Sequence, residues 1–177
     1  MTEYGLFTLF LFLHIGAAII AFGPSFAFPI IGAMAGKEPM HGNFATRVNE
    51  ALEDKLVLPF AISMPFTGVF LIWFGHINLL DRSGWWLDIA IVLYAIAITL
   101  AVAFQRPLIQ RLVRLTAGGP PPGAGAGGPA GEPAAGARPA GPPPEILATT
   151  KKIQRNGMIL SVLVVVIVLL MVTRPQF

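Results

Sequence analysis

The sequence predicts an all-α, polytopic membrane protein: a bundle of four transmembrane helices with a disordered Gly/Pro/Ala loop. Three observations lead to this prediction. Apolar residues make up 55% of the 177-residue chain and charged residues only 12%, which is about half the charged share of a soluble domain. Four apolar runs are long enough to cross a bilayer, which takes roughly 20 helical residues. A segment built almost entirely of Gly, Pro and Ala separates the third run from the fourth.

The composition also excludes several classes of function. The chain has no cysteine, so disulfides, thiolate metal sites and cysteine nucleophiles are ruled out. It contains no Walker loop, dinucleotide fingerprint, nucleophile elbow or paired metal-ligand spacing. The N-terminus has Glu3 but no Lys or Arg, unlike the start of a cleavable signal peptide. A role without catalysis is therefore favoured over an enzyme, the lipid bilayer is the expected partner, and nucleic acid is not.

The first predicted span covers about residues 4–34 and contains Gly23-Pro24. Because proline cannot donate a backbone hydrogen bond, we expect a kink there. A polar stretch follows, in which residues 43–56 are expected to form a surface helix leading into the second span, about residues 56–75. Prolines within that span predict a bent helix, which a membrane tolerates when neighbouring helices pack around it.

Trp85-Trp86 opens the third span, about residues 85–104, at the depth where tryptophan favours the lipid headgroups. Residues 106–115 then alternate arginine with aliphatic residues. Two interpretations of this basic amphipathic segment stay open. It lies flat on an anionic leaflet, or it is the end of the third helix with its arginines reaching the aqueous boundary.

The linker of residues 117–144 contains 26 Gly, Pro or Ala residues among its 28. Such a segment buries too little surface to offset the entropy lost on ordering, so we predict disorder. Residues 145–177 form the fourth transmembrane helix. The chain thus divides into three spans with the basic segment (residues 1–116), the linker, and a final helix.

The basic residues are distributed unevenly between the two sides of the membrane. The loops after the first and third spans hold ten of the twelve Lys and Arg residues, and the other side has only Arg82 and Arg174. Since basic loops stay in the cytoplasm, we expect both large loops there and both termini outside. The expected location is the inner membrane of a bacterial cell.

His14 is the principal candidate for a functional side chain, because it is the ionisable residue that lies deep in the first span. Ala17, Ala18, Ala21 and Ser25 share its helix face, and small residues mark close helix contacts. His14 is therefore expected to face the bundle. Two interpretations stay open: a histidine hydrogen-bonded to a carbonyl of a neighbouring helix, or a ligand of haem iron.

His76 follows the second span at its outer end, and it is the second candidate haem ligand. His41 lies on the cytoplasmic side and is expected to be an ordinary loop residue. Ser63 and Thr67, one turn apart in span two, are expected to bond back to carbonyls of their own helix. No residue is predicted to be catalytic or to bind a metal ion directly.

Four stretches of the sequence resemble known membrane proteins: Leu13-His14-Ile15 with Phe22-Gly23 and Pro29, Pro65-Phe66-Thr67-Gly68, Trp85-Trp86, and Met171-Val172-Thr173-Arg174-Pro175. They resemble a family of predicted bacterial four-helix integral membrane proteins of unknown function. That group is similar to copper-resistance protein D and to the bacterial membrane protoporphyrinogen oxidase. The likeness covers all four spans and leaves out the linker.

The resemblance implies a four-helix membrane fold and a haem-binding role, with haem b as the cofactor, for the position of His14. The oxidase also has a lysine in its third helix shortly after a tryptophan. Here that region reads Trp86-Leu87-Asp88-Ile89-Ala90 and has no lysine, which argues against protoporphyrinogen oxidation.

Three functional hypotheses remain open. The favoured one is an integral membrane protein without its own catalytic activity, acting as a homo-oligomer or as a small subunit of a larger membrane complex. The second is a haem-binding membrane redox protein that uses His14. The third is a transporter of a small solute or metal, which has the least support because the spans lack polar rows.

Overall fold

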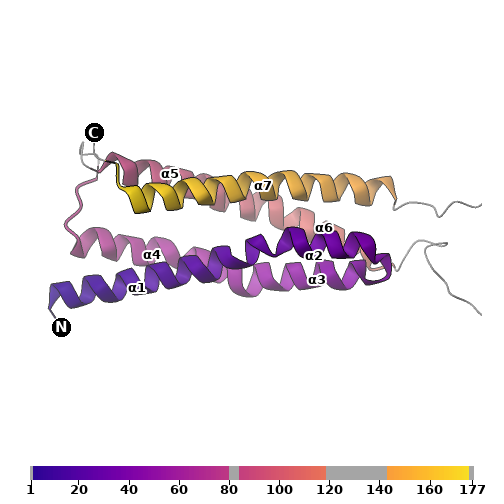
Figure 1. Ribbon diagram of the computed structural model, residues 1–177, viewed down its shortest axis with the longest axis horizontal. Helices are drawn as coiled ribbons and strands as arrows, with labels where there is room; N and C mark the ends of the chain where they lie inside the picture. The colour runs from indigo at the N-terminus through magenta and orange to yellow at the C-terminus, as the bar shows by residue number, and fades with distance from the viewer. Residues whose placement is uncertain (1, 80–83, 119–142, 176–177) are drawn as a thin grey trace, which may run out of the picture.

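Four long helices lie side by side, and the two chain termini lie at the same end of the assembly (Figure 1). The computed structural model describes residues 2–79, 84–118 and 143–175. Within these ranges, all regular structure is helical, and four helices are long and apolar enough to cross a membrane. The predicted all-α architecture with four spans is confirmed.

The first membrane-length helix is interrupted where the sequence predicts a kink. It consists of α1 (Glu3–Phe22), a 3₁₀ segment η1 (Gly23–Phe26) and α2 (Phe28–Lys37). Pro24 stands near the start of η1, where its missing N–H breaks the α-helical hydrogen-bond ladder. A tighter 3₁₀ turn replaces the α-helical turn at this point, so α1 and α2 remain parts of one long helix.

The second helix differs from the prediction. After the short 3₁₀ turn η2 (Pro39–His41), α3 (Gly42–Leu52), a π-helical segment η3 (Glu53–Val57) and α4 (Leu58–Phe74) form one continuous helix. A helix that leads into the second span is therefore present over the predicted residues 43–56, but it is continuous with the span. Its polar residues belong to an extension of the second span that packs against α2 and α6.

The third helix is also longer than predicted. It runs through α5 (Trp85–Leu100), a π-helical segment η4 (Ala101–Gln105) and α6 (Arg106–Thr116). Ile109 is buried, and α6 packs against α3 and α7. The basic segment is thus the end of the third helix, and the interpretation that it lies flat on the leaflet is not supported.

The fourth helix, α7 (Pro144–Thr173), extends well beyond its apolar run at the N-terminal end, as predicted. Its first turn is tied to α6 by an ion pair between Glu145 Oε1 and Arg111 Nη2 at 2.6 Å. Most of the predicted disordered linker, residues 119–142, lies outside the described residues.

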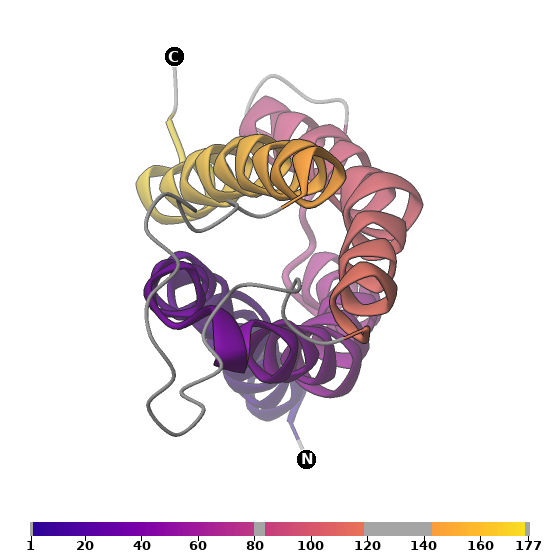
Figure 2. The same cartoon turned by 90° about the vertical axis from the view of Figure 1, so that its right-hand side faces the viewer.

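The helices pack chiefly as two pairs, α1 with α4 and α5 with α7. The pairs are joined at one end by α3 and α6, where Asn43 Nδ2 donates to Thr116 Oγ1 at 3.0 Å, and Figure 2 shows the four helices arranged around a common axis. Small side chains make up half of the buried apolar core: Ala17, Ala21, Ala61, Ala90 and Ala97. They allow the close helix approach that stabilises bundles in lipid.

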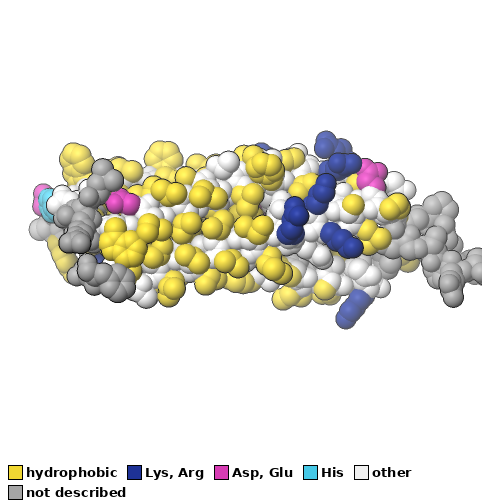
Figure 3. Space-filling view, turned by 90° about the horizontal axis from the view of Figure 1, so that it is seen from above, with side chains coloured by type: hydrophobic (Ala, Val, Ile, Leu, Met, Phe, Trp, Pro, Cys, Tyr) yellow, Lys and Arg dark blue, Asp and Glu magenta, His cyan; other side chains and the backbone are white. Residues whose placement is uncertain are grey.

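The surface is divided into an apolar and a basic zone. Figure 3 shows apolar side chains over most of one face, with Lys and Arg gathered toward the end opposite the chain termini. Large side chains such as Phe12, Trp73 and Val172 are exposed. In water this surface would promote aggregation, whereas lipid chains solvate it.

Candidate functional site

His14 lies on α1 and reaches across to α4. Its Nδ1 atom is 2.8 Å from Oγ1 of Thr67, and the contact is partly buried. Both residues occupy the middle of the α1–α4 pair, the closest-packed pair of the molecule. The prediction that His14 faces the bundle agrees with this position. The ring contacts the Thr67 hydroxyl and also hydrogen-bonds to the backbone of Met64 on α4, as the packing interpretation expected of a carbonyl on a neighbouring helix.

The direction of this hydrogen bond follows from the second contact of Thr67. Its Oγ1 is 3.0 Å from the carbonyl oxygen of Met64 and 3.4 Å from that of Ser63. A carbonyl can only accept, so the single hydroxyl hydrogen of Thr67 is donated within α4. In this arrangement the hydroxyl oxygen accepts from the Nδ1–H of His14, whereas a hydroxyl that donated to Nδ1 would give up both bonds within α4. The predicted back-bonding of Thr67 is confirmed, as is that of Ser63, which donates to Phe60 at 2.8 Å.

This assignment fixes the tautomer of His14. With Nδ1 protonated, a neutral imidazole keeps the lone pair of Nε2 free to bind a metal ion. Histidine ligands of metals are commonly oriented in this way, by donating their other ring N–H to a fixed acceptor. Thr67 therefore plays the part of an orienting residue.

Gly68 has no side chain and so leaves room for the His14 imidazole beside α4. A Cβ atom built on Gly68 would lie 3.6 Å from Cε1 of His14, so the ring rests close to the helix backbone. On α1, Ala17 and Ala21 are buried on the same helix face as His14. Of the predicted row of small residues, these two alanines are buried in the bundle, and Ala18 and Ser25 are half-buried.

His76 lies far from His14. Its Nε2 atom is 3.9 Å from Oε2 of Glu3, and both side chains are largely exposed. Eleven residues separate Glu3 from His14 along α1, which corresponds to roughly 16 Å at 1.5 Å per residue. The structure therefore does not bring the two candidate histidines together, and this arrangement does not allow both to bind one iron.

His41 is exposed, and its Nδ1 lies 3.0 Å from Oε2 of Glu38 in the same turn. Across residues 2–79, 84–118 and 143–175, no three His, Cys, Asp or Glu side chains gather as metal ligands would. His14 is left as the candidate ligand with a defined orientation.

Two apolar hollows open toward the lipid. One, of about 260 Å³, is lined by Val69, Phe70, Trp73 and Phe74 of α4. Phe70 stacks on Phe10, one turn before His14, with ring centroids 4.3 Å apart. This hollow therefore adjoins the His14–Thr67 contact on its outer side without including it.

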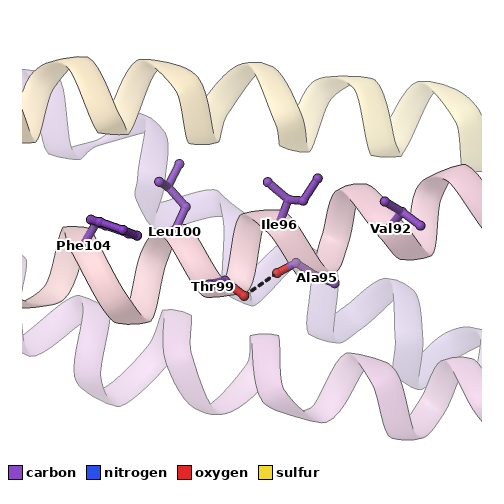
Figure 4. Close-up of a pocket in the computed structure, with 6 residues that line it drawn as sticks. All are labelled: Val92, Ala95, Ile96, Thr99, Leu100 and Phe104. Atoms are coloured by element: carbon purple, nitrogen blue, oxygen red, sulfur yellow. Dashed lines mark hydrogen bonds between the residues drawn. The ribbon is translucent and has the colours of Figure 1, made fainter.

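The second hollow, of about 450 Å³, lies along the third helix. Figure 4 shows its lining residues following one another along that helix, from Val92 to Phe104, with Thr99 donating to the carbonyl of Ala95. Apart from the Thr99 hydroxyl, which is satisfied in this way, the lining is aliphatic or aromatic. Such a surface suits a lipid chain and offers no group for chemistry.

The fold and its apolar surface define the class of the protein: a four-helix integral membrane protein with a single oriented histidine between its first two spans. The chain belongs to a family described as predicted integral membrane proteins (DUF2269), whose model matches residues 8–118. The match covers more than half of the chain, from α1 to the end of α6. No curated protein and no solved structure gives a significant match.

Proposed function

We propose that this protein is a small membrane subunit in which His14 would bind the iron of a b-type haem. The observation that supports the proposal most directly is the hydrogen bond from Nδ1–H of His14 to Thr67, at 2.8 Å. It holds the ring in one tautomer with Nε2 available, and imidazole nitrogen is a common axial ligand of haem iron. A haem bound there would supply one-electron redox chemistry.

The surroundings of His14 fit such a ligand in two further respects. The aromatic hollow beside Phe70 presents apolar surface of the kind that packs against a porphyrin. Thr67 accepts the Nδ1–H and would keep the ring from rotating, as hydrogen-bond acceptors behind metal-bound histidines do. The resemblance of the His14 segment to families associated with haem supports the same position.

The proposed role as a subunit follows from the surroundings of His14, where the described residues provide neither a second iron ligand nor an enclosing pocket. Among the described residues, His76 is remote and neither hollow includes His14. Further groups that hold and cover the haem would then come from a second copy of the chain or from another membrane protein. The predicted homo-oligomer or larger complex is part of the proposal for this reason.

The orientation and location of the protein complete the proposal. The bundle ends in a cluster of Lys and Arg side chains opposite the chain termini, and basic residues favour the cytoplasmic side. Both termini would face outward from the inner membrane of a bacterial cell, and His14 would lie in the outer half of the bilayer.

The experiment is absorbance spectroscopy of the protein purified in detergent from cells with ample haem supply. The wild type should show a Soret band whose intensity indicates bound haem. His14→Ala should lose the band and still elute as a monodisperse species. His41→Ala is the matched control, because His41 is exposed at the opposite end of α1–α2, and it should retain the band.

The Thr67→Val variant tests the orienting hydrogen bond separately from the proposed iron ligand, Nε2 of His14. It removes the acceptor of the Nδ1–H and leaves Nε2 in place, so haem should bind more weakly but not disappear. Loss of 10–100-fold in affinity is typical when such a partner is removed. A colourless wild type under these conditions, or a His14→Ala variant with an unchanged Soret band, refutes the haem proposal.

A further inference from the structure

The fourth helix carries three exposed basic side chains, Lys151, Lys152 and Arg155, which we call the α7 basic cluster. Their spacing of three and four residues places them on one face of the helix. Met158 and Ile159 stand three and four residues after Arg155, and they are 72% and 45% exposed. Figure 3 looks onto the side where α7 lies in Figure 1, and it shows Lys and Arg side chains where the apolar surface ends. The lipid-facing surface of α7 therefore continues directly into the three cations.

Contacts with the third helix set the depth of the α7 basic cluster. Gln105 Nε2 donates to the carbonyl oxygen of Ile153, within the cluster, at 3.4 Å. The next residue of the third helix, Arg106, donates through Nε to Asp54 Oδ1 of the second helix at 3.0 Å. At this level the second and third helices change from apolar spans to polar extensions. Long basic side chains at such a boundary reach the lipid headgroups.

Two arginines at this end of the bundle are neutralised within the protein, but the α7 basic cluster is not. Arg106 pairs with Asp54 at 3.0 Å, and Arg111 pairs with Glu145 at 2.6 Å. Across the residues that the structure describes, the three side chains of the cluster form neither an ion pair nor a side-chain hydrogen bond. Their charges are therefore available to an anion from outside the protein.

Carboxylates are scarce around the α7 basic cluster. The third helix, which packs against α7, has no Asp or Glu from Ile89 to Thr116, and its Asp88 lies at the opposite end. Within residues 143–175, Glu145 is the single carboxylate side chain, and it is already in an ion pair. On the second helix, the buried Glu53 is attracted to Arg106. This distribution leaves a local excess of positive charge on the face of α7 that turns to lipid.

We propose that the α7 basic cluster binds the headgroup phosphate of an anionic phospholipid in the leaflet at this end of the bundle. The guanidinium of Arg155 can hold two phosphate oxygens at once, and the two ammonium groups add positive charge. The acyl chains of the same lipid lie along the exposed Met158, Ile159 and Val162. A phospholipid thus presents its anion and its apolar chains in the order in which α7 presents cations and apolar side chains. The site lies on α7 and His14 on α1, so it stands whether or not haem binds.

The test is electron paramagnetic resonance of the intact protein in phosphatidylcholine vesicles that contain a trace of spin-labelled phosphatidylglycerol or spin-labelled phosphatidylcholine. The fraction of motionally restricted label gives the relative affinity of the protein for the two headgroups. The wild type should prefer phosphatidylglycerol about fivefold, which is what one basic side chain contributes near an anionic membrane surface. Because about 1 M salt shortens the screening length to roughly 3 Å, NaCl at that concentration should remove most of the preference.

Two triple variants separate the α7 basic cluster from the net charge of the protein. The first neutralises the cluster and should lower the preference to about one: Lys151→Gln, Lys152→Gln and Arg155→Gln. The second, a matched control, removes as many charges from exposed positions at the same end: Lys37→Gln, Arg47→Gln and Arg114→Gln. Arg47 and Arg114 lie seven and eight residues beyond the Asp54–Arg106 pair, which is roughly 10–12 Å of helix. The control should therefore keep the wild-type preference.

Inorganic phosphate in place of chloride, at constant ionic strength, distinguishes a lipid from a free anion. The preference should be the same in both buffers, and its loss in phosphate would mean that free phosphate occupies the cluster, which overturns the proposal. The proposal is also overturned if the wild type does not distinguish the two headgroups, or if its preference does not respond to salt. Equal loss in the two triple variants would overturn it as well, because net charge and not the α7 basic cluster would then be responsible.

Discussion

A double-mutant cycle on His14 and Thr67 tests the central contact of the structure. Thr67→Val keeps the shape of the side chain but removes the hydroxyl acceptor, so His14 keeps only its contact with the backbone of Met64 between α1 and α4. A fully unsatisfied buried donor costs about 1–3 kcal/mol, which is the upper bound for this variant. His14→Phe keeps an aromatic ring in contact with Gly68 and leaves no unpaired donor.

The two single variants should therefore be unequal. After His14→Phe, the hydroxyl of Thr67 still donates to the carbonyl of Met64 at 3.0 Å, so the expected loss is below about 1 kcal/mol. Interhelical hydrogen bonds in membranes average about 0.6 kcal/mol and reach about 1.7 kcal/mol. We expect a coupling energy of about 1 kcal/mol, with the double variant little less stable than His14→Phe alone.

Equilibrium unfolding in mixed micelles of mild detergent and dodecyl sulfate, followed by tryptophan fluorescence, measures these free energies. Thr99→Val is the matched control, because the Thr99 hydroxyl is exposed and bonds only within α5, to the carbonyl of Ala95 at 2.7 Å. It should show no coupling with His14→Phe. If the effects of His14→Phe and Thr67→Val add to within about 0.5 kcal/mol, the hydrogen bond does not stabilise the folded protein and the assigned tautomer loses its basis.

Three further predictions concern topology, the linker and helix packing. A reporter fused at Ala126 should behave as cytoplasmic and one after Phe177 as external, and export of the first would reverse the orientation. Shortening the linker of residues 117–144 by half should leave thermal stability nearly unchanged, because halving a flexible loop changes closure by about 0.6 kcal/mol; a large loss of folded protein would mean that the segment packs against the bundle. Gly68→Ala should be tolerated, since its Cβ would meet its nearest neighbour at 3.6 Å, whereas Gly75→Ala should lower Tm, since its Cβ would lie 2.6 Å from the backbone oxygen of Leu71; equal Tm values for the two variants would contradict the packing.

The four spans could be predicted from the sequence because length and hydropathy of an apolar run are local properties. The kink at Gly23-Pro24 was predictable for the same reason, as it follows from a missing N–H. A helix over residues 43–56 was predicted as well, and the end of the third helix was one of two interpretations of residues 106–115, but the packing of these two extensions against each other was not predicted. Residues 42–55 and 106–116 are polar or amphipathic, and they remain helical because α3 and α6 pack against each other beyond the apolar zone. That pairing is a tertiary contact, and the local hydropathy of either segment does not indicate it.

The burial of Glu53 and Gln105 was not predicted, for a related reason. Glu53 and Gln105 border polar stretches, where a charged or amide side chain normally meets water. Their burial depends on π-helical turns that rotate each side chain relative to a regular helix, and a single sequence gives no periodic signal for such turns. A carboxylate just ahead of an apolar run that begins with Leu56 and Val57 was the available hint.

The sequence presents the two interpretations of His14 as alternatives, but the structure assigns them to different atoms. Packing uses Nδ1, which donates to Thr67, and iron ligation would use Nε2. A hydrogen bond that contributes about 1 kcal/mol to folding also fixes the direction of the second nitrogen. The unfolding cycle and the Soret measurement therefore report on separate atoms of one ring. A positive coupling energy with a colourless wild type would leave His14 as a packing residue, whereas a Soret band that Thr67→Val weakens would require both roles together.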